Sequence, residues 1–192
     1  FIGLGAMGYP MAGHLKRSGL DVCVYNRTET KAFAWADEYD GLSAPTPAEA
    51  AVDAQIVFLC VGNDSDVRSV TVEAEGVLST MTAGTLLVDH TTTSKALAEE
   101  LHAACNDLGI AFIDAPVSGG QAGAENGVLT VMAGGEASAF KVMEPVIAAY
   151  AKHTQRMGDV GSGQVTKMVN QLCIAGIPVS YTHLRAHETA RH

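Results

Sequence analysis

The sequence GLGAMG (residues 3–8) lies between two apolar residues and the helical pattern MAGHLKRSG (residues 11–19). This is the spacing G-x-G-x-x-G in the strand–turn–helix context that binds a pyrophosphate. Gly3 permits the tight turn, Gly5 lets the backbone approach a phosphate at the positive helix end, and Gly8 lets the helix pack closely on the strand. The alternative is a glycine turn without a ligand. The motif and its context predict a dinucleotide site here.

Short apolar runs alternate with helical patterns along the rest of the chain. The runs are continuously apolar and bounded by turn residues, which is typical of parallel strands covered on both faces. The pattern predicts an α/β fold with a doubly wound, mostly parallel sheet of the Rossmann type. The clearest helix is expected in residues 94–109, and the strands are expected in DVCVY (21–25), residues 42–44, AQIVFLCV (54–61), GTLLVD (84–89), GIAFIDAP (109–116) and VLTVMAGG (128–135).

Composition narrows the range of functions. The chain has 192 residues, 47% of them hydrophobic and 17% charged, which suffices for one α/β domain with a buried core. A net charge of -9 argues against a nucleic-acid surface, because 12 Lys and Arg residues are scattered among 21 Asp and Glu residues. No apolar run approaches the roughly 20 residues of a membrane span, and the separated cysteines do not suggest disulfides. We expect a cytoplasmic protein with no nucleic-acid or membrane partner.

The end of the second strand carries a basic residue. Arg27 lies 24 residues beyond Gly3, near the position, roughly 20 residues on, where an acid normally binds the ribose 2′-hydroxyl. A guanidinium flanked by the Asn26 amide and the Thr28 hydroxyl is suited instead to a 2′-phosphate. This favours NADP over NAD. The alternative is that Thr28 is a helix N-cap and Arg27 a solvated surface charge.

Two further segments carry candidate substrate and catalytic residues. The segment DAPVSGGQAGAENG (114–127) is predicted to be a polar loop, in which the N–H groups of Ser118, Gly119 and Gly120 form a nest for a carboxylate. By itself this pattern is also that of an ordinary glycine-rich turn. On the last helix, Asn170 and Gln171 follow Lys167 by three and four positions and share its face. Burial would lower the pKa of this lysine and suit it to general acid/base catalysis, whereas an exposed lysine is the usual alternative.

Taken in order, these motifs resemble the β-hydroxyacid dehydrogenase family, most closely its 3-hydroxyisobutyrate dehydrogenase branch. The segments GLGAMGYPMAGHL, YNRT, VGND, DHTTTS, DAPVSGGQAGAENGVLTVMAGG and GSGQVTKMVNQ carry the resemblance, which covers residues 1 to about 178. D-A-P-V-S-G-G together with G-x-G-x-x-x-K-x-x-N is the specific part. The related phosphogluconate enzymes share the S-G-G and lysine signatures, but GVLTVMAGG and KMVNQ are less similar to their versions.

The resemblance implies hydride transfer between NADP, or NAD, and a small 3-hydroxy acid or its semialdehyde. It makes Lys167 the general acid/base, assisted by Asn170 or Gln171, and assigns the substrate carboxylate to Ser118, Gly119 and Gly120. No metal is implied. The alternative is a non-catalytic dinucleotide-binding module. The cofactor contacts implied by the resemblance are Gly3, Leu4, Gly5, Ala6, Met7, Gly8, Asn26, Arg27, Thr28, Val61, Gly62 and Thr92.

The resemblance also implies a domain organisation. Residues 1–160 are expected to form the NADP-binding domain, and residues 161–178 the start of an interdomain helix that leads into a helical domain. Family members commonly form homo-oligomers through that helical domain, and we expect the chain without it to be poorly active. The helical pattern is predicted to end at Pro178. Residues 179–192, with His183 and His187 at i,i+4 spacing, are expected to be a non-native tail rather than a metal site.

Overall fold

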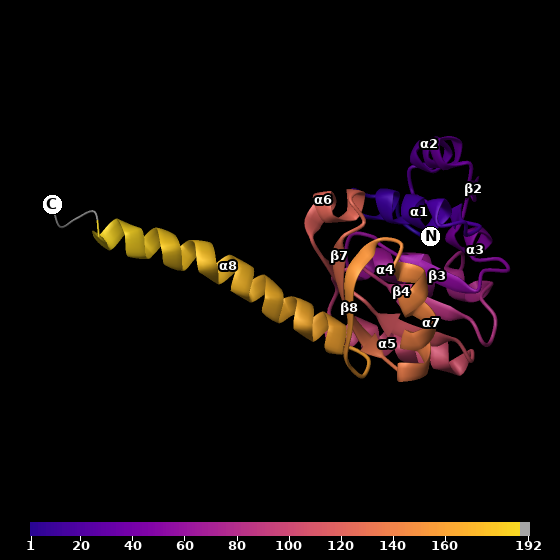
Figure 1. Ribbon diagram of the computed structural model, residues 1–192. Coiled ribbons are helices and arrows are strands. Elements are labelled where there is room, and N and C mark those ends of the chain that lie inside the picture. Colours follow the sequence, from indigo (N-terminus) through magenta and orange to yellow (C-terminus); the bar gives the residue numbers. More distant parts are fainter. Residues whose placement is uncertain (189–192) are drawn as a thin grey trace.

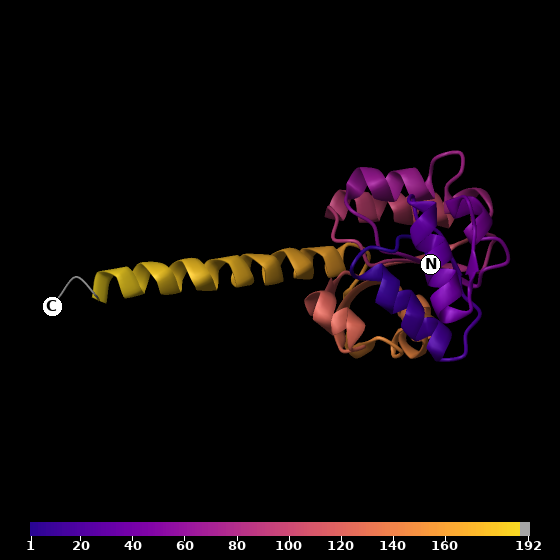
Figure 2. The same ribbon diagram turned by 90° about the horizontal axis from the view of Figure 1, so that it is seen from above.

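A sheet covered by helices on both faces forms the body of the protein in the computed structural model (Figures 1 and 2). The structure describes the backbone of residues 1–188 and the side chains of residues 1–176. None of the helices in this described part is long and apolar enough to cross a membrane.

The sheet has a parallel half and a mixed half. Ile2 forms parallel bridges to both Tyr25 and Leu59 and so joins two groups of paired strands. The order β3-β4-β5 is parallel, as is β1-β2, whereas β7 runs antiparallel to β5 and β6 and parallel to β8. The predicted mostly parallel, doubly wound sheet is confirmed. The strands are β1 (Cys23–Val24), β2 (Leu42–Ser43), β3 (Ile56–Leu59), β4 (Leu86–Asp89), β5 (Ala111–Asp114), β6 (Val117–Ser118), β7 (Leu129–Gly135) and β8 (Ala151–Gly158).

Each face of the sheet has its own buried core, because successive strand residues point to opposite faces. Leu87 and Val88 are both fully buried, one in each core. Figure 2 shows α1 on one side of the sheet and α4 with α5 on the other. The first core contains residues of α1 (Gly8–Arg17), α2 (Glu29–Tyr39), α6 (Gly120–Glu125) and α7 (Ala137–Ile147), and the second contains residues of α3 (Pro47–Ala50), α4 (Asp64–Thr71), α5 (Lys95–Asp107) and the 3₁₀ helix η1 (Val77–Ser79).

Two elements differ from the sequence-based expectation. Strand β8 was not predicted, because its residues are mostly exposed or half-buried and lack the continuous apolar run of the other strands. Residues 114–127 are not a loop throughout, because they contain β6 and α6. Here the backbone pairing of β6 with β7 and the packing of buried Ala124 outweigh a composition typical of loops.

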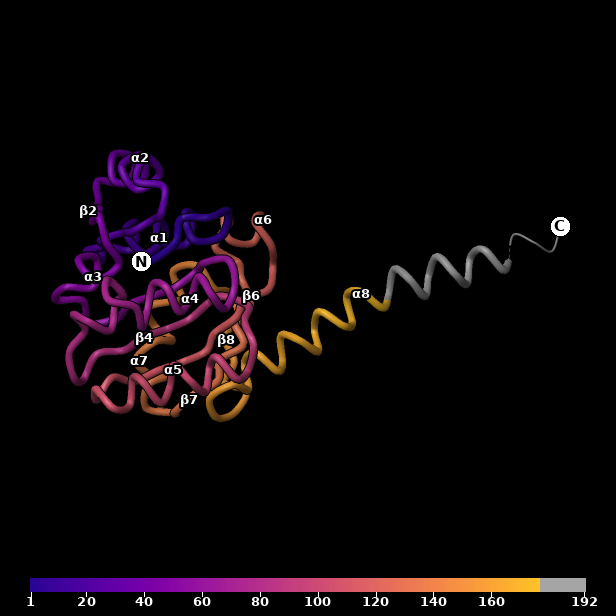
Figure 3. The backbone as a smooth tube through the Cα atoms, turned by 180° about the vertical axis from the view of Figure 1, so that it is seen from behind, coloured from indigo at the N-terminus to yellow at the C-terminus, as the bar shows by residue number. Residues whose placement is uncertain are grey.

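The last helix, α8 (Ser162–Glu188), begins after a glycine-rich turn and extends away from the body beside β8 (Figures 1 and 3). The predicted end at Pro178 is wrong, since the bounds of the helix run ten residues past it. No glycine or second proline follows Pro178 to stop a helix. The side chains of the expected tail, residues 179–192, lie outside the described residues, and so do His183 and His187. The domain boundaries and the non-native origin of the tail remain predictions.

Candidate functional site

The glycine loop lies where the order of the strands reverses. Ile2 is paired with Tyr25 after β1 on one side and with Leu59 of β3 on the other. The strands β1 and β2 therefore lie to one side of this position, and β3, β4 and β5 lie to the other side. Ligands of open α/β sheets bind in the crevice at such a switch point, at the carboxyl ends of the strands. Most of the residues implicated by sequence follow these strand ends.

The three motif glycines have different surroundings. Gly3 has a φ of +96°, and a Cβ built there would clash with the carbonyl oxygen of Cys60. A Cβ at Gly8 would meet the carbonyl oxygen of Gly3, so this glycine allows the helix start to close on the turn. Gly5 differs, because no protein atom lies within 4 Å of a Cβ built there. The loop therefore uses two glycines for its own conformation and leaves one with an open side at the start of α1.

Backbone donors of this loop remain available to a ligand. In the described part of the chain, the N–H groups of Gly5, Ala6 and Met7 have no protein acceptor. Gly5 and Ala6 are exposed and Met7 is half-buried. Uncommitted N–H groups at a helix N-terminus are a site for phosphate oxygens. A dinucleotide pyrophosphate fits these donors and the open side of Gly5.

Asn26 supports the loop from the end of β1. Its Oδ1 accepts a hydrogen bond of 3.0 Å from the N–H of Leu4, and its Nδ2 donates to the carbonyl oxygen of Thr28 at 3.1 Å. The side chain thus links the glycine loop to the start of α2. Thr28 occupies the N-cap position of α2, but its hydroxyl makes no capping hydrogen bond. The expected N-cap is therefore present in position only, and the Thr28 hydroxyl is free for other contacts.

Arg27 lies at the outer edge of the same region. Its side chain is 87% exposed, and its Nη1 is 3.4 Å from Oδ1 of Asp66 on α4. Asp66 also lies against Gly62, because a Cβ built there would clash with its Oδ2. The Arg27 guanidinium therefore faces the carboxylate of Asp66, a residue that was not among the candidates from the sequence. A pair this exposed contributes little to stability and leaves Arg27 able to turn toward a phosphate.

Hydrogen bonds link the segments that follow β3 and β4. The N–H of Val61 donates to Oγ1 of Thr91 at 3.1 Å, and the N–H of Thr91 donates to Oδ1 of Asp89 at 2.8 Å. Burial of Asp89 raises its pKa to about 7. Thr92, the residue after buried Thr91, is exposed. The structure thus places the expected contacts Val61, Gly62 and Thr92 along one edge.

The segment with the expected carboxylate nest is held beside the glycine loop. His14 Nε2 of α1 lies 3.0 Å from the carbonyl oxygen of Ala124, which joins α1 to α6. A cavity of about 650 Å³ lies between the glycine loop, α2 and α6, with Gly5 and Gln121 among its lining residues. Gly119 and Gly120 are exposed, with φ of +132° and +61°. Positive φ angles of this kind suit glycine.

Lys167 lies one turn and a half into α8. The residue is only 8% exposed, and within the described part of the chain it forms no ion pair or hydrogen bond. Burial lowers its pKa from the usual 10.5. Asn170, three residues on, has a buried Nδ2 without a hydrogen-bond partner, whereas Gln171 is exposed. An unpartnered buried amide on the lysine face is a group that a substrate oxygen would satisfy.

Sequence reasoning missed two buried polar residues at the base of α8. The carboxylate of Asp114 accepts hydrogen bonds from the N–H groups of Gly161 and Gln164. The Gln164 side chain in turn binds the backbone at Thr91 and Thr93. Asp114 falls in both the expected strand GIAFIDAP and the predicted loop, and its position at the end of an apolar strand was the available signal.

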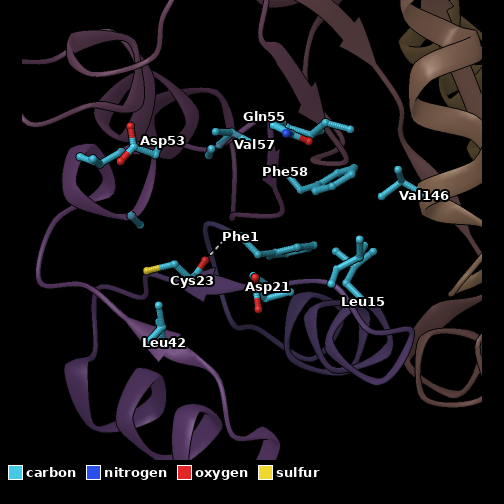
Figure 4. Close-up of a pocket in the computed structure, with 16 residues that line it drawn as sticks. Phe1, Leu15, Asp21, Cys23, Leu42, Asp53, Gln55, Val57, Phe58 and Val146 are labelled. Carbon is cyan, nitrogen blue, oxygen red and sulfur yellow. Dashed lines mark hydrogen bonds between the residues drawn. The ribbon is translucent and has the colours of Figure 1, made fainter.

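A second cavity, of about 490 Å³, lies at the opposite, amino-terminal ends of the strands (Figure 4). Its walls include the apolar side chains of Phe1, Leu15 and Phe58, and the amino group of Phe1 donates to the carbonyl oxygen of Cys23 at 2.6 Å. None of the predicted site residues lines it. In the described residues no group of three or more His, Cys, Asp or Glu side chains is arranged to hold a metal ion.

Comparison with known proteins gives consistent matches. Residues 1–182 match the family described as the NAD binding domain of 6-phosphogluconate dehydrogenase. An uncharacterized oxidoreductase of Shewanella frigidimarina is 57% identical over 177 residues, which are 92% of this chain and 61% of that protein. A protein of Arabidopsis thaliana named "Probable 3-hydroxyisobutyrate dehydrogenase-like 1, mitochondrial" is 42% identical, with 91% of this chain and 52% of that protein covered. The NAD-dependent L-serine dehydrogenase of Pseudomonas aeruginosa is 35% identical, with 91% and 58% covered.

Solved structures agree. The 3-hydroxyisobutyrate dehydrogenase of Mycobacterium tuberculosis, described with L-serine, has a TM-score of 0.90 at 30% identity and covers 100% of this chain and 65% of its own. A protein named Psf3, in complex with NADP+ and 2-OPP, has a TM-score of 0.86 at 30% identity, with 97% and 67% covered. The chain spans about 60% of the length of the first two bacterial relatives that it matches.

Proposed function

This chain belongs to the NAD(P)-dependent β-hydroxyacid dehydrogenase family, and we propose on that basis that the protein transfers a hydride between NADP and a small 3-hydroxy acid or its semialdehyde. The observation that carries the proposal is Lys167, a buried lysine without a protein partner in the described residues and with a lowered pKa. A structural lysine would be paired or exposed.

Each part of the site has a role in this reaction. Bound nicotinamide supplies the hydride acceptor for oxidation and the hydride donor for reduction. Neutral Lys167 accepts the hydroxyl proton during oxidation and returns it from its ammonium form during reduction. The N–H groups of Ser118, Gly119 and Gly120 hold the carboxylate and so determine which carbon faces the cofactor. Asn170 is the better candidate than Gln171 for orienting the hydroxyl, because its Nδ2 is buried and unpartnered.

The cofactor preference rests on Arg27. An exposed guanidinium beside the free Thr28 hydroxyl is suited to a 2′-phosphate, and the acid that would bind a ribose 2′-hydroxyl is absent at this strand end. Similar proteins include both an NADP+ complex and an enzyme named as NAD-dependent, so the preference depends on this chain's own residues.

The substrate class rests on the nest and on the relatives. 3-Hydroxyisobutyrate and L-serine, which appear in the names of similar proteins, both have a carboxylate and a hydroxyl on the β-carbon. A backbone nest and a lysine suit that pair of groups. A cytoplasmic location and a homo-oligomeric state remain proposals of the same kind.

A spectrophotometric screen tests the function. The full-length protein is mixed with NADP or NAD and a panel of small 3-hydroxy acids, and with the reduced cofactors and the matching semialdehydes, while absorbance at the reduced nicotinamide band is followed. We expect turnover with a 3-hydroxy acid and a preference for NADP. Tight cofactor binding without turnover of any acid would instead favour the non-catalytic binding module.

A further inference from the structure

The first turn of α8 is anchored to the sheet by a buried carboxylate. Oδ1 of Asp114, at the end of β5, accepts a hydrogen bond of 2.7 Å from the N–H of Gly161, and its Oδ2 accepts one of 2.9 Å from the N–H of Gln164. Asp114 is 0% exposed. These N–H groups belong to the helix start, where no intrahelical acceptor exists. One side chain therefore both satisfies the helix start and attaches it to β5.

Gln164 provides a second anchor in another direction. It is 0% exposed, and its Oε1 accepts a hydrogen bond of 3.0 Å from the N–H of Thr93. Its Nε2 donates to the carbonyl oxygen of Thr91 at 2.7 Å. Both polar ends of the amide are thus used on the segment that follows β4. The helix start is held to two neighbouring strand ends and not to one.

The backbone also leaves no room for the helix start to shift. A Cβ built at Gly163 would clash with the carbonyl oxygen of Met132, and one at Gly134 would stand 2.5 Å from Oδ1 of Asp114. Glycine at these two positions lets α8 and β7 approach the carboxylate closely. The contact tolerates little displacement, because packed interiors change between discrete arrangements and do not deform smoothly.

Burial of Asp114 makes its ionised form less favourable in the folded protein. Burial raises its pKa to about 6, although the N–H groups that it accepts from act in the opposite sense. Since the folded-state pKa lies above the usual 3.8, the folded chain binds this proton more tightly than the unfolded chain, and stability falls as the pH rises from about 4 to about 6. Ionisation of Asp114 at neutral pH therefore costs stability relative to its protonated form, while the ionised carboxylate accepts the hydrogen bonds of the helix start.

Lys167 is the residue that these anchors position. It follows Gln164 by three residues, so both lie on the same face of α8, and within the described residues its side chain forms no hydrogen bond or ion pair of its own. We propose that Asp114 and Gln164 are positioning residues that seat the first turn of α8 and thereby keep Lys167 in its desolvated position. This inference rests on the proposed function, because a desolvated lysine matters only if Lys167 exchanges the substrate proton.

The experiment measures the pKa of Lys167 directly and needs no turnover. The protein is labelled with [¹³Cε]lysine, the Lys167 resonance is identified by its absence in Lys167→Arg, and pH titrations are compared for wild type and Asp114→Asn. Loss of positioning admits water to Lys167, so its pKa should rise toward 10.5. The simple electrostatic effect of removing an anion has the opposite sign and would lower it. Amide exchange at Gly161 and Gln164 should also quicken by about tenfold or more.

Two further variants complete the test. Asp159→Asn is the matched control, because this carboxylate lies in the turn between β8 and α8 but its side chain is fully exposed, and it should leave the pKa of Lys167 unchanged. Gln164→Met keeps the length of the side chain and removes both of its hydrogen bonds, so it should shift the Lys167 pKa in the same direction if Asp114→Asn does not fold. An unchanged or lowered pKa in a folded anchor variant would overturn the positioning role. Absence of turnover in wild type, with the pKa shift present, would overturn the dehydrogenase function alone.

Discussion

The edge that runs from the glycine loop to Arg27 and Gly62 is open, whereas the base of α8 is closed. In the described residues this edge has backbone N–H groups without a protein acceptor and an arginine that is 87% exposed. The base of α8, formed by Asp114, Gln164 and Lys167, is buried, and its carboxylate and amide each make two hydrogen bonds to backbone groups. The first region is open to solvent, and we propose that it receives the cofactor. The second is closed, and we propose that it holds Lys167 in place.

This difference predicts which property a mutation in each region should change. At an open edge a deleted group was exposed to water before the ligand arrived, so its removal changes ligand affinity and leaves the fold nearly intact. In a closed junction a deleted group leaves buried partners unsatisfied or exposes a buried side chain to water, so the effects are larger. The predictions below test this contrast, from the largest expected effect to the smallest.

Removal of the buried lysine should have the largest effect. Lys167→Ala should lower turnover by roughly 10² to 10⁴-fold and leave cofactor affinity nearly unchanged, since general acid/base catalysis contributes about that factor. In the oxidation direction the wild-type rate should rise with pH as the amine loses its proton, with a midpoint below 10.5 because burial lowers the pKa. Steady-state rates across pH test both points. Lys152→Ala, at an exposed position of β8, is the control, and wild-type turnover in Lys167→Ala would remove the mechanism.

Two alanine substitutions in the glycine loop should separate a folding role from a binding role. Gly3→Ala places a methyl group against the carbonyl oxygen of Cys60 at a φ of +96° and should destabilise the protein by roughly 2–4 kcal/mol. Gly5→Ala meets no protein atom within 4 Å and should change stability by less than about 0.5 kcal/mol while weakening NADP binding. Urea unfolding and cofactor titration measure the two effects. Equal destabilisation by both substitutions would contradict the distinction.

At the exposed edge, Arg27→Ala should affect one cofactor only. Loss of a charge-assisted hydrogen bond to the 2′-phosphate should weaken NADP by about 10-fold to 100-fold, whereas NAD, which lacks that phosphate, should bind nearly as before. Titration of wild type and variant with both cofactors at one moderate salt concentration measures this, because salt screens exposed charges. Equal losses for NADP and NAD would identify Arg27 as a solvated surface charge.

The smallest effect is expected at the carboxylate opposite this arginine. Asp66→Asn removes the anion that lies 3.4 Å from Arg27 and would repel a 2′-phosphate, so NADP should bind roughly two- to fivefold more tightly. Glu73→Gln, an exposed acid just beyond α4, serves as a charge-matched control. The ratio of NADP to NAD affinity is the measurement, and a ratio that moves equally in both variants would show only the effect of net charge.

Local rules explain why much of the molecule is readable from the chain. The G-x-G-x-x-G motif predicts the turn, because only glycine tolerates the φ of Gly3 and the close approach of Gly8. Continuous apolar runs predict parallel strands buried on both faces, and helical spacing predicts α5. These features depend on neighbours within a few positions along the sequence. The resemblance to the β-hydroxyacid dehydrogenases then supplies candidate roles for Lys167 and for Ser118 to Gly120, which remain proposals.

Other features depend on residues that are far apart in the chain. Strand β8 has no apolar run that would predict it, and it forms because its backbone pairs with β7. Arg27 and Asp66 are 39 residues apart, and Asp114 and Gly161 are 47 apart. The sequence by itself thus determined the continuously apolar strands, the glycine turn and the fold class, through steric and periodic preferences that act locally. Only the tertiary structure decided which carboxylate faces Arg27 and that Asp114 anchors α8, because hydrogen bonds and ion pairs form between groups that folding brings within about 3 Å of each other.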